Sequence, residues 1–102
     1  MALYVVRCNF ADPQKEEEWN HWYSTEKREA LLSVPGFREV KRYQAVGIDQ
    51  QVKYLATWEI DSPAVLESDA YKAVWGWGSW KPNIVDLTRT IYEEIRPPHS
   101  GA

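Results

Sequence analysis

The chain has 102 residues, is 44% hydrophobic and 14% aromatic, and carries a formal net charge of −3, which fits one globular domain with one modest core. It has no run of Lys and Arg that could follow a phosphate backbone and no apolar stretch of membrane-spanning length, so neither nucleic acid nor a membrane is an expected partner. A single cysteine, Cys8, excludes a disulfide framework and zinc-type ligand spacing, and the N-terminus lacks the features of a secretory signal, which together predict a cytoplasmic location.

Hydrophobic patterning predicts four strands and two helices in the order βαββαβ. The strands are expected over residues 2–10, 37–46, 52–60 and 84–95. An Asp-Pro pair at 12–13 is typical of a helix start, so the first helix is expected over about 13–33, before VPG at 34–36. A Ser-Pro pair at 62–63 starts the second helix, which ends at GWG, 76–78. A short polar connection at 47–51 indicates a hairpin.

This order is the ferredoxin-like α+β arrangement, in which two helices pack on one face of a four-stranded antiparallel sheet. Residues 1–95 are expected to form this single domain, followed by a flexible tail at 96–102. The first strand carries Leu3 and Val5 on one side and larger apolar residues on the other. Because the uncovered sheet face is then too apolar for water, we expect a homodimer whose two sheets meet face to face.

The first expected helix places a carboxylate in the middle of its apolar face. At about 100° per residue, Glu26 falls near the centre of a stripe formed by Trp19, Trp22, Tyr23, Ala30 and Val34. Burial among indoles would raise the pKa of Glu26 and suit it to general acid or base catalysis. The alternative is a structural ion pair with a strand arginine, Arg7, Arg42 or Arg89, which would lower that pKa.

Two neighbours of Glu26 are further catalytic candidates. Lys27, on the flank of the stripe, could stabilise an enolate or phenolate or form a Schiff base; the alternative is a lysine that extends its ammonium into water. Tyr23 could donate a hydrogen bond to a substrate oxygen, or simply pack in the core.

Aromatic residues are the candidates for the wall of a substrate pocket. The substrate-binding set comprises Trp19, Trp22, Trp58, Trp75, Trp77, Trp80 and Arg7. The last three tryptophans lie in VWGWGSW, a segment that could act as a lid; alternatively these indoles fill the core or the dimer contact. His21 is expected to face solvent and His99 lies in the tail, so no metal site and no cofactor are expected.

Three segments, WNHWYSTEK, LLSVPGF and KYLATWEIDSPAVLESDAY, resemble the dimeric α+β barrel superfamily, specifically small EthD-like proteins with a W-Y-x-T-E-H helix and a V-P-G-F turn. The resemblance covers roughly residues 2–95. It implies a dimer with a ligand cavity between each sheet and its own helices. Its relatives include cofactor-independent monooxygenases, polyketide cyclases, isomerases and lyases. Lys27 stands where such relatives commonly have histidine, so a histidine-based mechanism does not carry over.

The sequence therefore predicts a cofactor-independent enzyme that acts by proton transfer on a small, apolar, aromatic or polyketide-like carbonyl compound, as a cyclase, isomerase or lyase. In this interpretation Glu26 moves the proton, and Tyr23 and Lys27 stabilise the oxyanion. The alternatives are a cofactor-free monooxygenase and a non-catalytic small-molecule binding protein.

Overall fold

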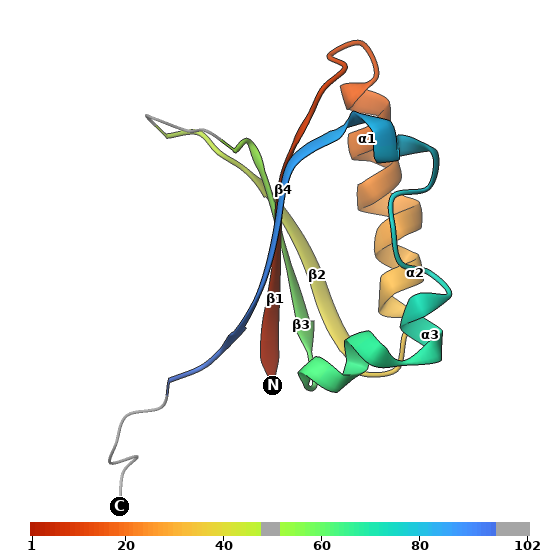
Figure 1. Ribbon diagram of the computed structural model, residues 1–102, viewed down its shortest axis with the longest axis vertical. Helices are drawn as coiled ribbons and strands as arrows, with labels where there is room; N and C mark the ends of the chain where they lie inside the picture. Colours follow the sequence, from red (N-terminus) through yellow and green to blue (C-terminus); the bar gives the residue numbers. More distant parts are fainter. Residues whose placement is uncertain (48–51, 96–102) are drawn as a thin grey trace, which may run out of the picture.

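Four strands form a single antiparallel sheet in the computed structural model, which describes residues 1–47 and 52–95 (Figure 1). The strands are β1 (Ala2–Phe10), β2 (Phe37–Gln44), β3 (Tyr54–Ile60) and β4 (Ile84–Glu93). Their order across the sheet is β2-β3-β1-β4, with every neighbouring pair antiparallel. The predicted ferredoxin-like α+β fold is confirmed. The prediction of one domain with a tail stays a prediction, because residues 96–102 lie outside the described part of the chain, as do residues 48–51 of the expected hairpin.

One long helical rod covers one face of the sheet (Figure 1). It consists of α1 (Glu16–Trp22), a π-helical turn (Tyr23–Lys27) and α2 (Arg28–Leu32). The rod begins later than the sequence predicts, because Asp12 is used in a turn instead of a helix cap. Its Oδ1 accepts the backbone N–H of Gln14 at 3.0 Å, and its carbonyl accepts that of Lys15.

The second predicted helix is broken into short pieces. A 3₁₀ turn covers Pro63–Glu67, the single α-helical turn α3 covers Asp69–Lys72, and a further 3₁₀ segment covers Gly78–Asn83. The break falls at Ser68, whose backbone is extended and whose side chain accepts the N–H of Tyr71. Serine competes for nearby backbone groups in this way, which favours caps over helix interiors.

Alternate residues of the two central strands build the core beneath the helices. In β1 these include Tyr4, Val6 and Phe10, and in β3 they include Trp58 and Ile60. The helix contributes Trp19 and Tyr23, both buried. At the end of the rod Gly36 has φ +98°, and an added Cβ would lie 2.5 Å from a methyl of Val65, so glycine is required at this turn.

The π-helical turn reverses the sequence prediction for Glu26 and Lys27. Trp19, Tyr23, Lys27 and Leu31 are spaced by four residues, a series that drifts around an α-helix of about 3.6 residues per turn. A π turn, with its i→i+5 pattern, holds more residues per turn and keeps the series on one side. All four residues are therefore buried, whereas Glu26 is exposed. The predictions of a buried Glu26 and of a solvated Lys27 are wrong.

A bulge in β4 decides which of its side chains face the helices. The register shifts between Arg7 and Asn9, and Asp86 adopts φ 55° while its carboxylate accepts a hydrogen bond from the Asn9 amide at 2.9 Å. Beyond the bulge, Val6 pairs with Arg89. Since Val6 faces the helices, Arg89 does as well.

The opposite face of the sheet has no helix over it (Figure 1). Tyr43 and Tyr92 are 52% and 53% exposed in the single chain, and Leu3, Val5 and Leu55 are partly exposed. These residues form an apolar patch on the outer face, which also carries Arg7, Lys41 and Thr57. Among the described residues, no helix is long and apolar enough to span a membrane.

Candidate functional site

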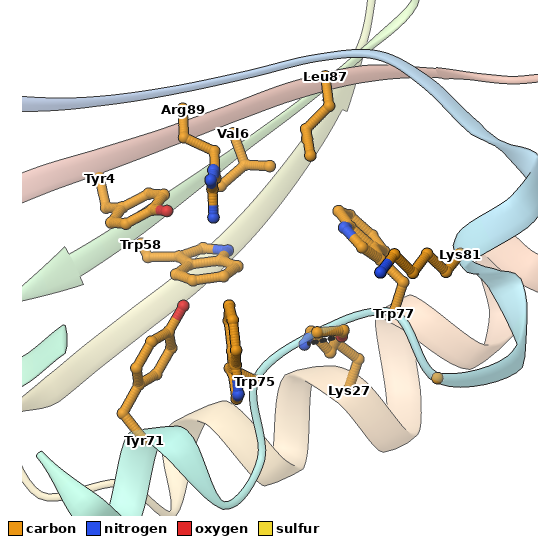
Figure 2. A pocket seen from close by; sticks show the side chains of 12 residues that line it. Tyr4, Val6, Lys27, Trp58, Tyr71, Trp75, Trp77, Lys81, Leu87 and Arg89 are labelled. Carbon is orange, nitrogen blue, oxygen red and sulfur yellow. Dashed lines mark hydrogen bonds between the residues drawn. The ribbon is translucent and has the colours of Figure 1, made fainter. Parts of the chain in front are cut away.

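A cavity of about 380 Å³ lies between the helix side of the sheet and the segment that follows α3 (Figure 2). The sheet contributes Tyr4, Trp58 and Arg89 to its lining, and the helical rod contributes Lys27. The segment after α3 closes the remaining side with Trp75 and other residues up to 78. Aromatic rings therefore form most of the wall, and basic groups supply its charge.

Trp58 is a rigid wall of this cavity. Its indole stacks on Tyr4, with ring centroids 4.8 Å apart, and meets Tyr71 edge-on at 6.3 Å. Its Nε1 donates a hydrogen bond of 3.2 Å to the hydroxyl of Tyr23. Because these contacts hold the indole and leave it only 4% exposed, Trp58 forms a fixed part of the cavity wall.

Lys27 enters the cavity from the helix side and is held by the backbone of the facing segment. Its Nζ donates hydrogen bonds to the carbonyl oxygens of Val74, at 3.4 Å, and of Gly76. The residue is only 4% exposed, and its ammonium lies 5.8 Å from the centroid of the Trp77 ring. No salt bridge within residues 1–47 and 52–95 includes Lys27.

Burial without a counterion changes the acidity of Lys27. Removal of the ammonium from water lowers the pKa of Lys27 from 10.5 to about 8. A lysine in this range can exchange a proton near neutral pH. Lys27 therefore has a pKa shifted by burial toward neutral pH, which the sequence predicted for Glu26.

Glycines determine the backbone conformation of the segment that accepts the hydrogen bonds of Lys27. Gly76 has φ +95° and Gly78 has φ +56°, a left-handed geometry that favours glycine. The turn between α3 and the 3₁₀ segment can therefore bring two backbone carbonyls to one ammonium. The predicted lid segment is thus tied to the helix through Lys27.

The charged lining of the cavity is basic. Lys27, Lys81 and Arg89 contribute to it, and none of the described residues that line it is Asp or Glu. Figure 2 shows the Arg89 side chain extending from β4 toward Trp58, and Lys81 extending toward Trp77 on the other side of the cavity. Such a cavity concentrates positive potential on a chain whose net charge is −3.

The predicted catalytic residues lie in three different environments. Lys27 lines the main cavity. Tyr23 is buried beside it with its hydroxyl bonded to Trp58, and burial raises the pKa of Tyr23 above its ordinary range. Glu26 does not line that cavity; it lines an adjoining shallow hollow together with Lys27 and Trp22. In the part of the chain that the structure describes, Glu26 forms no salt bridge.

The arginines expected as partners of Glu26 are placed elsewhere. Arg42 packs 4.3 Å from the centroid of Tyr23 and donates hydrogen bonds to Asn20 and Ser24. Arg7 is exposed and lies opposite Leu55 in the sheet. Neither the structural ion pair nor a role for Arg7 in this cavity has support from this geometry.

The predicted aromatic wall divides into two groups. Trp58, Trp75 and Trp77 line the cavity. Trp19 is fully buried in the core, and Trp22 and Trp80 pack against that core. The core alternative therefore describes these last three better than the pocket interpretation.

Eight lining residues were not among the predicted site residues, and four of them carry a polar or charged side chain: Tyr4, Tyr71, Lys81 and Arg89. The alternation of β1 could have indicated Tyr4, which shares a face with Val6. The bulge that turns Arg89 inward has no clear signature in the sequence. In the described residues, no group of three or more His, Cys, Asp or Glu side chains could hold a metal ion.

Comparisons with known proteins place the fold. No protein-family model and no curated protein sequence matches the chain. Among solved structures, an EthD family protein from Bacillus halodurans is 18% identical with a TM-score of 0.66, over 93% of this chain and 100% of that one. A DABB family protein with a ferredoxin-like fold from Mesorhizobium loti is 9% identical with a TM-score of 0.70, over 93% and 97%.

A third similar structure contains a ligand. It is a variant of MhuD with two manganese protoporphyrin IX molecules bound per active site; it is 11% identical with a TM-score of 0.71, over 95% of this chain and 97% of that one. At these identities the likeness shows a shared fold. The fold predicted from the resemblance to EthD-like proteins is thereby confirmed.

Proposed function

We propose that this protein is an enzyme that transfers a proton on a small aromatic or polyketide-like carbonyl compound, with Lys27 as the acid–base group. The observation that carries the proposal is a buried lysine without a carboxylate partner among the described residues, at the edge of an aromatic cavity. An uncompensated buried cation destabilises a fold. Such a group is a candidate for function.

The hydrogen bonds of Lys27 suit it to proton transfer. An ammonium has three donors, and two of them point to the carbonyl oxygens of Val74 and Gly76. The third position carries a proton in the ammonium form and a lone pair in the amine form. Lys27 can therefore give or take one proton while its two backbone contacts stay in place.

The proposed reaction begins with the amine form of Lys27. Its lone pair takes a proton from the carbon next to the substrate carbonyl, and the electron pair of that C–H bond moves into an enolate. Lys81, which lines the same cavity, stabilises the enolate oxygen. In isomerisation, the Lys27 ammonium then returns the proton to a different atom. In cyclisation, the enolate carbon attacks a second carbonyl, the C=O electron pair moves onto its oxygen, and the Lys27 ammonium protonates the alkoxide that forms. This chemistry requires no cofactor.

The proposed roles of Glu26 and Tyr23 therefore differ from those predicted from the sequence. Glu26, which the sequence assigned to proton transfer, is exposed and lines an adjoining hollow but not the main cavity. Tyr23 has its hydroxyl bonded to Trp58, so we assign it a positioning role: it holds the indole that forms a fixed part of the cavity wall.

The proposal includes the homodimer. The apolar patch on the outer face, with Tyr43 and Tyr92 each more than half exposed, needs a partner of equal apolar character. A second copy supplies this by a face-to-face contact, which also covers edge positions of β4 close to the cavity. The cytoplasmic location stays a prediction.

Deuterium exchange tests the proposed function without knowledge of the natural product. The full-length protein is incubated in heavy water with 2-tetralone and with phenylacetone, which carry exchangeable hydrogens between an aromatic ring and a carbonyl. We expect exchange faster than in buffer for the parent, and loss of this acceleration in Lys27→Met. Glu26→Gln serves as the matched control and should retain it. Exchange no faster than in buffer for both ketones would contradict the proposal and favour a binding protein.

A further inference from the structure

The cavity continues into an adjoining hollow whose charge is also positive. The two share Tyr4, Tyr71, Trp75 and Arg89. The hollow adds Lys72 to the basic groups. The chain has fifteen acidic residues against twelve basic ones, yet no acidic residue within the described ranges lines either space.

Arg89 is an exposed cation of β4 that lines both the cavity and the adjoining hollow. It extends from β4 toward Trp58, on the side of the cavity away from Lys81 (Figure 2). Across the described residues, no salt bridge includes Arg89. A guanidinium with free donors beside a flat indole can bind a carboxylate through two parallel hydrogen bonds.

Tyr71 lines the same two spaces as Arg89 and carries a hydroxyl that can bind an anion. Burial is the main cause that raises the pKa of Tyr71 to about 12; a hydrogen bond with the Tyr4 side chain also raises it, and the charge of Arg89 acts in the opposite direction. Tyr71 therefore stays neutral, and two hydroxyls that share one hydrogen bond keep one O–H donor for a ligand. A phenol donor and a guanidinium together are a suitable pair for an oxyanion.

The spacing of the basic groups separates two tasks. Figure 2 shows Lys27 and Lys81 toward Trp77, whereas Arg89 and Tyr71 lie close to Trp58, one on each side of it in this view. A flat ligand that extends along the tryptophans would place one end at each group. Proton transfer involves only the end of the ligand that lies at Lys27.

We propose that the substrate is an aromatic anion, whose carboxylate binds Arg89 and Tyr71 while its ring lies along Trp75, which lines both spaces and is 57% exposed. This proposal names the substrate class for the proposed proton transfer and rests on it. Lys72, at the rim of the adjoining hollow, attracts the anion without a direct role in the reaction.

Paired probes test the anion specificity by direct binding. 2-Naphthoate and 2-naphthamide have the same ring system and nearly the same shape, but only the first is charged. Isothermal titration, with tryptophan fluorescence as a second signal, gives the dissociation constants. We expect 2-naphthoate to bind about tenfold or more tightly than 2-naphthamide. Added salt should reduce this preference.

Two variants of Arg89 assign the preference to its charge. Arg89→Gln should abolish the preference for 2-naphthoate and leave 2-naphthamide affinity unchanged, whereas Arg89→Lys should retain part of it. Lys41→Gln removes one positive charge from β2, at the other edge of the sheet, and should have no effect. Equal affinity for the two probes, or a preference that survives in Arg89→Gln, would overturn the proposal.

The binding result is independent of the exchange result. A clear preference for 2-naphthoate without any ketone exchange would support the anion site and remove the proton-transfer function, which would leave a carrier of aromatic anions. Exchange of the neutral ketones without an anion preference would leave the proposed function standing and refute the carboxylate site.

Discussion

Substitution of Lys27 by methionine should change the stability of the protein in a way that depends on pH. Lys27→Met keeps the length of the side chain and removes its charge. In the parent, a lowering of the Lys27 pKa from 10.5 to about 8 costs the folded state about 3 kcal/mol below pH 8, at about 1.4 kcal/mol per pKa unit. The variant does not have this cost.

The sign of the effect follows from proton binding. Below pH 8 both the folded and unfolded chains carry a protonated Lys27, and the full cost is present. Between pH 8 and 10.5 the unfolded chain binds the proton and the folded chain does not, so the stability of the parent rises with pH. Above pH 10.5 the amine is neutral in both states and the cost is gone.

The substitution also removes two hydrogen-bond donors. The carbonyls of Val74 and Gly76 lose their contacts with Lys27, at about 1 kcal/mol each. We therefore expect Lys27→Met to be more stable than the parent by about 1 kcal/mol at pH 7 and less stable by about 2 kcal/mol at pH 10.5.

Urea unfolding at fixed protein concentration measures this difference at several pH values, with Lys41→Met as the control for loss of an exposed lysine. A difference in the free energy of unfolding between parent and Lys27→Met that is constant from pH 7 to 10.5 would refute the argument, since Lys27 would then titrate alike in both states.

Three further outcomes are expected. Sedimentation at micromolar concentration should show a dimer for the parent and a monomer for Tyr92→Glu, which places a charge on the apolar patch of the outer face; a monomeric parent would refute the face-to-face dimer. Gly36→Ala should lower the free energy of unfolding by about 1–3 kcal/mol in urea, since φ is +98° and the new Cβ would meet Val65; an unchanged urea midpoint would contradict this turn geometry. Ketone exchange should proceed at its normal rate under strict anaerobiosis, whereas oxygen consumption in proportion to product would support the monooxygenase alternative.

The order of elements could be predicted from sequence because strands and helices leave periodic patterns. The alternation in residues 2–10 and 52–60 reflects a sheet with one covered face, and Tyr4 and Trp58 are buried as that pattern requires. The ends of the second helix could not be predicted. The apolar spacing of residues 65–77 suits a helix, but the Ser68 side chain accepts the backbone N–H of Tyr71 and so interrupts it.

The site could be predicted only in part. The aromatic pattern of the first helix located the correct helical turn. A constant angle of about 100° per residue, however, placed Glu26 instead of Lys27 at the centre of the buried face. Hydrogen bonding in a π turn changes that angle without a change in residue type, so sequence periodicity cannot detect it. The β-bulge at Asp86 likewise changes the sheet face on which the Arg89 side chain lies, and sequence periodicity cannot detect it.

The dependence of the exchange rate on pH tests the central claim, that Lys27 is the group that moves the proton. With 2-tetralone in the parent protein, the account predicts a rate that rises with pH and levels off near pH 8, where Lys27 becomes the amine. The rise should be absent in Lys27→Met and unchanged in Glu26→Gln. A rate that shows no rise up to pH 8, and that is lost in Glu26→Gln but not in Lys27→Met, would contradict the account.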